Sequence, residues 1–143
     1  MTGNADGLQT LEKYSRIPVS SIRYVADADA DIVRSIHDGV LFLVAFWSGP
    51  SLGAFSKLTK AMHDMGLRDL ELVVVDVDGS PGVYQLPEIK ELFGGVVNAP
   101  PGWGEAAFCR DGQIVAAAVV GRGFDSNEYY FISRKLLSSF DGE

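Results

Sequence analysis

Residues 40–65 run VLFLVAFW, then SGPS, then LGAFSKLTKAMHDM, and the architecture of the whole chain follows from them. The first eight are apolar and rich in β-branched and aromatic types, which is typical of a strand buried on both faces of a helix-covered sheet. Apolar residues then recur at the spacing of one helix face, at Leu52, Phe55, Leu58 and Met62. Ser51 is suited to cap the start of this helix and Gly66 its end. We therefore predict a central strand, a tight turn and a helix.

This junction resembles the active-site segment of the thioredoxin superfamily, where Trp-Cys-Gly-Pro-Cys joins a central strand to a helix. The chain has Trp47-Ser48-Gly49-Pro50-Ser51 at this place, so hydroxyls replace both sulfurs. The resemblance implies an α/β, thioredoxin-like fold with a central mixed sheet of about four to five strands, flanked by helices on both faces. The family's reaction needs a low-pKa thiolate and a resolving thiol. We therefore predict no catalytic residue, with Ser48 and Ser51 forming a degenerate motif.

The resemblance also bears on how the cysteines were lost. Thioredoxins carry a buried Asp on this strand that assists proton transfer at the second Cys. Matching Val44-Ala45-Phe46-Trp47 to that context places Ala45 at the position of the Asp, and an ungapped alignment on the Trp places Phe42 there. Neither register supplies a carboxylate. An engineered trap would change a cysteine and leave the Asp in place, so natural loss is favoured over mutation.

Length and composition favour one globular domain. A chain of 143 residues, 47% of them hydrophobic, can bury one core of good size. Residues 1–7 are small and polar, and we expect 1–19 to be a partly disordered N-terminal extension. The thioredoxin-like domain is expected over 20–140.

Charge and cysteine usage exclude several classes of function. The formal charge is −7 and no cluster of Lys or Arg is visible along the sequence, so neither nucleic acid nor a membrane is expected as a partner. The single cysteine, Cys109, excludes an intramolecular disulfide and a cysteine-based zinc site. His37 and His63 stand apart, so we predict no metal and no cofactor. One cysteine and the lack of a signal or membrane-spanning pattern favour a cytoplasmic location.

The order of the predicted elements indicates parallel strand pairing. An amphipathic helix is expected over 8–17, a strand over 20–25 and a helix over 27–39. After the central strand and its helix, residues 70–77 form a further buried strand. Strand, helix, strand, helix, strand predicts right-handed parallel crossovers. Further along we expect a helix over 87–93, a hairpin over 105–120 with its turn at Asp111-Gly112, and a final helix over 126–140.

A binding groove is implied by the resemblance. Residues 96–100 resemble the family's segment leading into its cis-proline, with Pro100 the first candidate and Pro101 the second. Gly102-Trp103-Gly104 is an insertion beside this groove. The predicted groove comprises Trp47, Ser48, Gly49, Pro50, Ser51, Ala99, Pro100 and Trp103. The tryptophans are equally well explained as core or lid residues, but Trp is also a frequent anchor at protein interfaces.

Three other motifs have simpler explanations. Gly49-Pro50-Ser51-Leu52-Gly53 fits the nucleophile elbow of serine hydrolases, but no His follows at a suitable place. Asp76 and Asp78 resemble the first motif of haloacid-dehalogenase phosphatases, but the later Asp pair is missing, so we interpret them as strand-end solvation and turn capping. Cys109 is interpreted as an inert packed thiol.

The leading hypothesis is a redox-inactive thioredoxin-fold protein that binds a protein or peptide, as an adaptor or chaperone-like module, without being an enzyme. One alternative is a thiol-disulfide oxidoreductase whose cysteines were mutated to serine. Another is a single-thiol protein acting through Cys109, and a third is a structural subunit of a larger complex. The sequence leaves the oligomeric state open.

Overall fold

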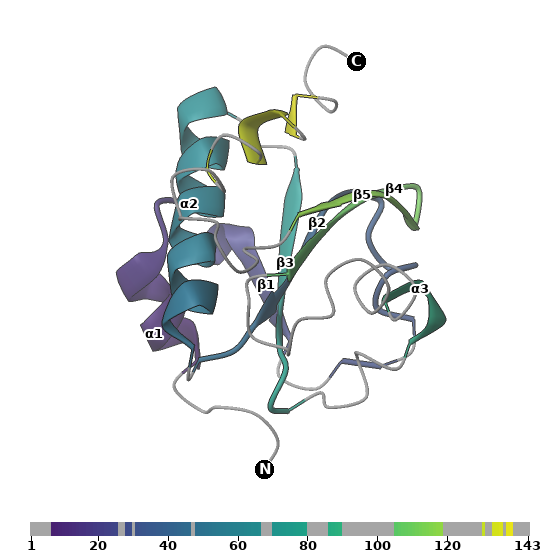
Figure 1. Ribbon diagram of the computed structural model, residues 1–143, viewed down its shortest axis with the longest axis horizontal. Coiled ribbons are helices and arrows are strands. Elements are labelled where there is room, and N and C mark those ends of the chain that lie inside the picture. Colours follow the sequence, from purple (N-terminus) through teal and green to yellow (C-terminus); the bar gives the residue numbers. More distant parts are fainter. Residues whose placement is uncertain are drawn as a thin grey trace.

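The computed structural model describes most of the chain as one sheet with helices on both faces (Figure 1). The described residues are 7–25, 28–29, 31–46, 48–66, 70–79, 86–89, 105–118, 130, 133–135 and 137–138. They include the segments that the sequence predicted as the core of the fold.

The sheet has five strands in the order β1-β3-β2-β4-β5. These are β1 (Ile22–Val25), β2 (Asp38–Val44), β3 (Glu71–Asp76), β4 (Glu105–Arg110) and β5 (Gln113–Ala118). β3 pairs in parallel with both β1 and β2, whereas β4 pairs antiparallel with β2 and with β5. The mixed sheet confirms the predicted α/β fold class and the parallel pairing of the first three strands.

The central strand is β2, as the apolar run predicted. Val40, Phe42 and Val44 face one side of the sheet and contribute to one core cluster, whereas Leu41 and Leu43 face the other cluster. All five side chains are at most 1% exposed. A strand with both faces buried and a neighbour on each side is the most protected position in the sheet. The alternation also decides which side chains face the helix that follows β2.

One face of the sheet is covered by α1 (Gly7–Tyr14), α2 (Gly49–Met65) and helical residues near the C-terminus (Figure 1). Leu11 of α1 and Leu137 join Phe55 and Leu58 of α2 in this core. α2 ends at Gly66, whose φ of 66° is the left-handed conformation that glycine adopts without strain. The predicted helix after the central strand and its glycine stop are therefore confirmed.

The opposite face is covered by less regular structure. Ile32, Val33 and Ile36 pack there with Ile89 of α3 (Pro87–Ile89). The regular helix predicted over 27–39 is wrong, because residues 31–35 form successive turns closed by bonds such as Ser35 N–H to the Asp31 carbonyl, 3.0 Å. The side chains that were predicted to face the core, Ile32, Val33 and Ile36, are nevertheless buried.

The hairpin β4–β5 has the predicted turn. Asp111 and Gly112 have φ values of 54° and 75°, and positive φ at both central residues defines the type I′ turn that suits the twist of the flanking strands. The register shifts between Phe108 and Cys109, so Val115 of β5 is an extra residue and is 57% exposed.

A short 3₁₀ turn, η1 (Val19–Ser21), leads into β1. The predicted helices over 87–93 and 126–140 fall largely outside the described residues.

Candidate functional site

The candidate site begins where β2 ends and the chain turns into α2. The Ser48 N–H donates to the carbonyl of Ala45 at 3.0 Å, which closes a tight turn. Ser48 has extended backbone angles, and its hydroxyl accepts a hydrogen bond from the Ser51 N–H at 3.3 Å. Ser48 is therefore the N-cap of α2. The prediction that Ser51 caps the helix was wrong by one turn, because α2 begins at Gly49 rather than at Leu52.

Ser51 instead links the helix back to the strand. Its hydroxyl accepts a hydrogen bond from the Ala45 N–H at 3.0 Å, and the side chain is fully buried. The Ala45 N–H lies one residue beyond the end of β2, where no neighbouring strand supplies a hydrogen-bond acceptor. Ser48 is also buried, at 7% exposure. Both hydroxyls that replace the family's sulfurs thus bond to backbone groups of the junction.

The exposed part of the junction is Gly49. It is the first residue of α2, and a Cβ built there would meet no heavy atom within 4 Å. Pro50 follows within the first turn, where its missing N–H costs no helical hydrogen bond. The first turn of α2 contains no acidic residue, so no carboxylate there offsets the positive end of the helix dipole at Gly49. Ser48, Gly49, Pro50 and Ser51 therefore lie together at one edge of the sheet.

The other half of the predicted groove lies outside the described residues. This applies to Trp47, Ala99, Pro100 and Trp103, and to the second cis-proline candidate, Pro101. Their place beside Gly49 remains a prediction.

A buried carboxylate, that of Asp76, lies near the junction, although we had predicted from the sequence that it would be exposed to solvent. Asp76, the last residue of β3, pairs with Val44 of β2 and is fully buried. Its oxygens accept hydrogen bonds from the Tyr24 hydroxyl at 3.2 Å and from the Asp78 N–H at 2.9 Å. The interpretation as strand-end solvation was wrong for Asp76, whereas turn capping is confirmed by the bond to Asp78.

Asp76 also occupies the helix-covered side of the sheet. Its side chain follows the alternation of Leu72 and Val74, which belong to the core beneath α2. Tyr24 stacks edge-on against Phe46, with ring centroids 6.2 Å apart, so the carboxylate, the phenol and the end of β2 are close neighbours. Neither Ala45 nor Phe42 carries a carboxylate, as predicted from the sequence. The buried acid is supplied by the adjacent strand, and only the pairing register reveals it.

Cys109 lies in β4 and is fully buried beneath the other face of the sheet. Burial raises the pKa of its thiol to about 12. Its sulfur has the Ala107 carbonyl at 3.8 Å as a weak acceptor. A thiol that stays protonated and covered at neutral pH is a poor nucleophile. The interpretation of Cys109 as a packed thiol is confirmed by its position.

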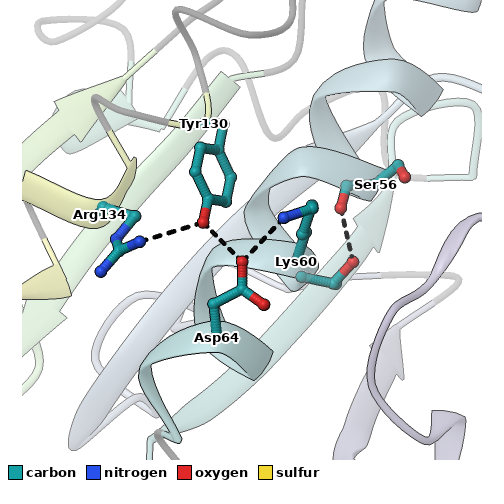
Figure 2. Close-up of polar contacts among 6 residues, drawn as sticks. Ser56, Lys60, Asp64, Tyr130 and Arg134 are labelled. Carbon is teal, nitrogen blue, oxygen red and sulfur yellow. Dashed lines mark hydrogen bonds and ion pairs between the residues drawn. The ribbon is translucent and has the colours of Figure 1, made fainter.

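A polar cluster at the far end of α2 was not predicted (Figure 2). Asp64 accepts hydrogen bonds from Lys60 at 2.8 Å and from the Tyr130 hydroxyl at 2.5 Å, and Arg134 donates to that hydroxyl at 3.2 Å. The hydrogen bonds from Lys60 and then Tyr130 lower the pKa of Asp64, and the bond to Asp64 raises the pKa of Lys60. The four-residue spacing of Lys60 and Asp64 could have indicated their ion pair. Tyr130 could not have been predicted as a partner, because it lies 66 positions from Asp64 in the sequence.

None of the helices among the described residues is both long and apolar enough to span a membrane. No three His, Cys, Asp or Glu side chains in that part of the chain lie close enough together to hold a metal ion.

Comparison with solved structures shows which fold this is. A chain from a structure on the thiol resolving mechanism of yeast mitochondrial 1-Cys peroxiredoxin superposes with a TM-score of 0.54 at 18% identity, covering 81% of this chain and 96% of that one. A chain of the ferredoxin:thioredoxin reductase complex with thioredoxin f2 gives 0.53 at 17% identity, covering 84% and 96%. Thioredoxin from Malassezia sympodialis gives 0.50 at 18% identity, covering 80% and 89%. No family model and no curated protein matches.

The protein therefore has the thioredoxin-like fold. Within that fold it lacks the dithiol pair, since its one cysteine is Cys109 and the motif positions hold Ser48 and Ser51.

Proposed function

We propose that this protein is a redox-inactive thioredoxin-fold module that binds an extended segment of a protein partner. The partner would bind around Gly49, where the C-terminal end of the central strand β2 meets the start of α2. The observation that carries the proposal is the state of the two serines. Both hydroxyls are buried and bonded to backbone, so the junction keeps its shape without any group able to exchange electrons. The fold thus retains a defined surface while lacking the atoms of dithiol chemistry.

The junction offers specific contacts to a peptide. Gly49 is exposed with open space around it, and its N–H, at the first position of α2, has no helical partner. Peptide carbonyl oxygens are natural acceptors for such groups. Trp47, Ala99, Pro100 and Trp103 complete the proposed groove, with the tryptophans as apolar anchors. Thioredoxin f2, a structural neighbour, was crystallised in a complex with a protein partner, its reductase.

Two observations weigh against the enzymatic alternatives. A single-thiol reaction through Cys109 would need the thiolate, but this thiol is buried and its pKa is raised to about 12. An oxidoreductase mutated at Ser48 and Ser51 is opposed by Ala45, which carries no carboxylate at the position where the family's reaction uses one. We place the protein in the cytoplasm, since its single cysteine can form no internal disulfide.

The proposal is tested by blocking the groove without disturbing the fold. Gly49→Gln and Gly53→Gln are matched variants, because a Cβ at either glycine of α2 meets nothing within 4 Å. Binding of a fluorescent, reduced and carboxymethylated insulin B chain, which is an extended peptide, is measured by anisotropy. We expect Gly49→Gln and Trp103→Ala to weaken binding at least fivefold and Gly53→Gln to leave it within twofold. Equal binding by all four proteins, or no binding, would reject the groove.

Redox inactivity has a separate test. In the insulin reduction assay with dithiothreitol, we expect the rate with the protein to equal the rate without it, because no accessible thiol is present. Turnover above that background would contradict the proposal. Restoring both cysteines, as Ser48→Cys/Ser51→Cys, is expected to allow a disulfide to form but to give slow turnover, since Ala45 supplies no proton acceptor and the Asp76 carboxylate is already bonded to Tyr24 and Asp78.

A further inference from the structure

Six basic side chains that are scattered along the sequence lie on the helical layer covering one face of the sheet. The layer consists of α1 with the residues after it, α2, and residues 130, 133–135 and 137–138 (Figure 1). Its basic residues are Lys13, Arg16, Lys57, Lys60, Arg134 and Lys135, which we call the cationic layer. These segments contain only two acidic residues, Glu12 and Asp64. The sequence reading found no cluster of Lys or Arg because the fold, rather than the chain order, brings them together.

Direct contacts join the parts of the cationic layer. The Lys60 ammonium lies 4.5 Å from the centroid of the Tyr130 ring, and Arg134 donates to the Tyr130 hydroxyl (Figure 2). Lys57 precedes Lys60 by about one helical turn, so both project from neighbouring positions of α2. On the other flank, the Arg16 N–H donates to the Thr59 hydroxyl of α2 at 3.0 Å. The segments that carry the basic residues therefore pack against α2 on both of its flanks.

The cationic layer is not neutralised from within. Six basic and two acidic side chains give its segments a formal charge of +4, whereas the other described residues hold three basic and nine acidic side chains, which amount to −6. Asp64 is already bonded to Lys60 and Tyr130. Among the described residues, no ion pair involves Lys13, Arg16, Lys57 or Lys135. Among the described residues, positive charge is therefore in excess in this helical layer, whereas negative charge is in excess in the rest.

We propose that the cationic layer is a docking surface for an acidic segment of a protein partner, rich in Asp and Glu. Charge complementarity between a positive patch and an acidic segment orients and accelerates association. Nucleic acid and anionic membranes fit less well, because their extended arrays of phosphate would also meet the field of the acidic side chains on the rest of the described molecule.

A second copy of this chain fits less well too. The described acids Asp29 and Asp31 accompany the turns that cover the opposite face of the sheet. Pairing that face with the cationic layer of another molecule would be head-to-tail, and such contacts grow into open chains unless they close.

The surface is separate from the groove around Gly49. Lys57 lies eight residues along α2, which corresponds to about 12 Å at the rise of an α-helix. The cationic layer can therefore bind its partner whether or not the groove binds a peptide.

The test compares two pairs of substitutions with the same change in net charge. Lys57→Gln/Lys135→Gln removes two charges from the cationic layer. Arg23→Gln/Arg34→Gln removes two from the opposite face, where Arg23 donates to Ser35 at 2.6 Å and Arg34 is largely exposed. The probe is a fluorescein-labelled peptide of about twelve glutamates in dilute salt, with a glutamine peptide of equal length as reference. Circular dichroism confirms that each variant is folded.

We expect the first pair to weaken glutamate-peptide binding about fivefold and the second pair to change it less than twofold, since each exposed ion pair contributes modestly. If both pairs weakened glutamate-peptide binding equally, the proposal would be overturned, because binding would then depend on the net charge of the protein and not on the cationic layer. Failure of the wild-type protein to prefer the glutamate peptide over the glutamine peptide would also overturn it. Tighter binding to single-stranded DNA of equal length or to phosphatidylserine vesicles would overturn it as well, assigning the surface to those partners.

Discussion

The Ser51 hydroxyl accepts a hydrogen bond from the Ala45 N–H at 3.0 Å, and this contact fastens the first turn of α2 to the end of the central strand. Ser51, which takes the place of the second cysteine in the resemblance to the thioredoxin motif, therefore has a structural role here. A hydroxyl suits this role because it is a good acceptor and small enough to be buried completely.

Ser51→Ala is expected to lower the free energy of unfolding by about 1–3 kcal/mol, because it leaves the buried Ala45 N–H without its acceptor. Ser48→Ala removes the N-cap and should cost about 0.5–2 kcal/mol. Urea denaturation measures both. Ser56→Ala, in the middle of the same helix, serves as the control and should be neutral or slightly stabilising. A loss at Ser56 as large as that at Ser51 would show that the hydroxyl contact is unimportant.

Two glycines of neighbouring elements should respond oppositely to alanine. A Cβ at Gly39 of β2 would lie 2.3 Å from the Glu71 carbonyl oxygen of the paired strand, and backbone cannot move aside easily. We expect Gly39→Ala to cost at least about 2 kcal/mol. At Gly53 of α2 nothing lies within 4 Å, so Gly53→Ala should gain about 0.5–1 kcal/mol. Thermal unfolding of both variants distinguishes these signs, and a stable Gly39→Ala protein would contradict the β2–β3 register.

Cys109 should resist alkylation in the folded protein. With its pKa raised to about 12, its thiolate fraction at pH 8 is roughly a thousandfold below that of an ordinary thiol, before burial is considered. Iodoacetamide labelling followed by mass spectrometry measures the rate. Ser138→Cys supplies an exposed reference thiol in the same fold, and guanidinium chloride should make Cys109 react at a normal rate. Comparable rates for the two cysteines in the native protein would revive the single-thiol alternative.

The Lys60–Asp64–Tyr130 cluster should make a small, pH-dependent contribution to stability. The pKa of Asp64 is lowered in the folded state, so the contribution is present above the ordinary aspartate value of 3.8 and is lost as the pH falls through the lowered value. The pKa of Lys60 is raised, so its contribution is present below 10.5 and is lost as the pH rises through the raised value. The difference in urea midpoint between the wild type and Asp64→Asn should therefore be constant near neutral pH and shrink at both extremes.

Tyr130→Phe is the companion variant for this cluster. It keeps the aromatic ring beside Lys60 but removes the hydroxyl that donates to Asp64. Its stability should fall less than that of Asp64→Asn, because the Lys60 bond remains. High salt should reduce the effect of Asp64→Asn more than that of Tyr130→Phe, since exposed ion pairs are screened. An effect of Tyr130→Phe larger than that of Asp64→Asn would show that the ring is packed differently.

The core strands and the main turns were predictable because each is determined by residues that are adjacent in the sequence. The apolar run from Val40 fixes the central strand, and Asp111-Gly112 fixes the hairpin turn through its positive φ values. Gly66 ends α2 for the same local reason. The predicted helix over 27–39 failed because apolar spacing fixes which side chains are buried but does not require regular helical bonds between them.

What was missed depends on pairing between distant segments. Asp76 follows four apolar residues and precedes a turn, so the local sequence indicates exposure, but Tyr24 of another strand provides the donor that allows burial. Two serines three residues apart can each cap a helix, and only the end of β2 at Val44 decides that Ser48 does. The cationic layer likewise arises only after three helical segments have packed on the sheet.

The strand order has a consequence for synthesis of the chain. β1 pairs with β3, although β2 is made between them. While the protein emerges from the ribosome, residues 22–25 have no strand to join until residue 76 has left the exit tunnel. During that interval Ile22 and its neighbours form an exposed apolar segment of the nascent polypeptide, of the kind that chaperones bind.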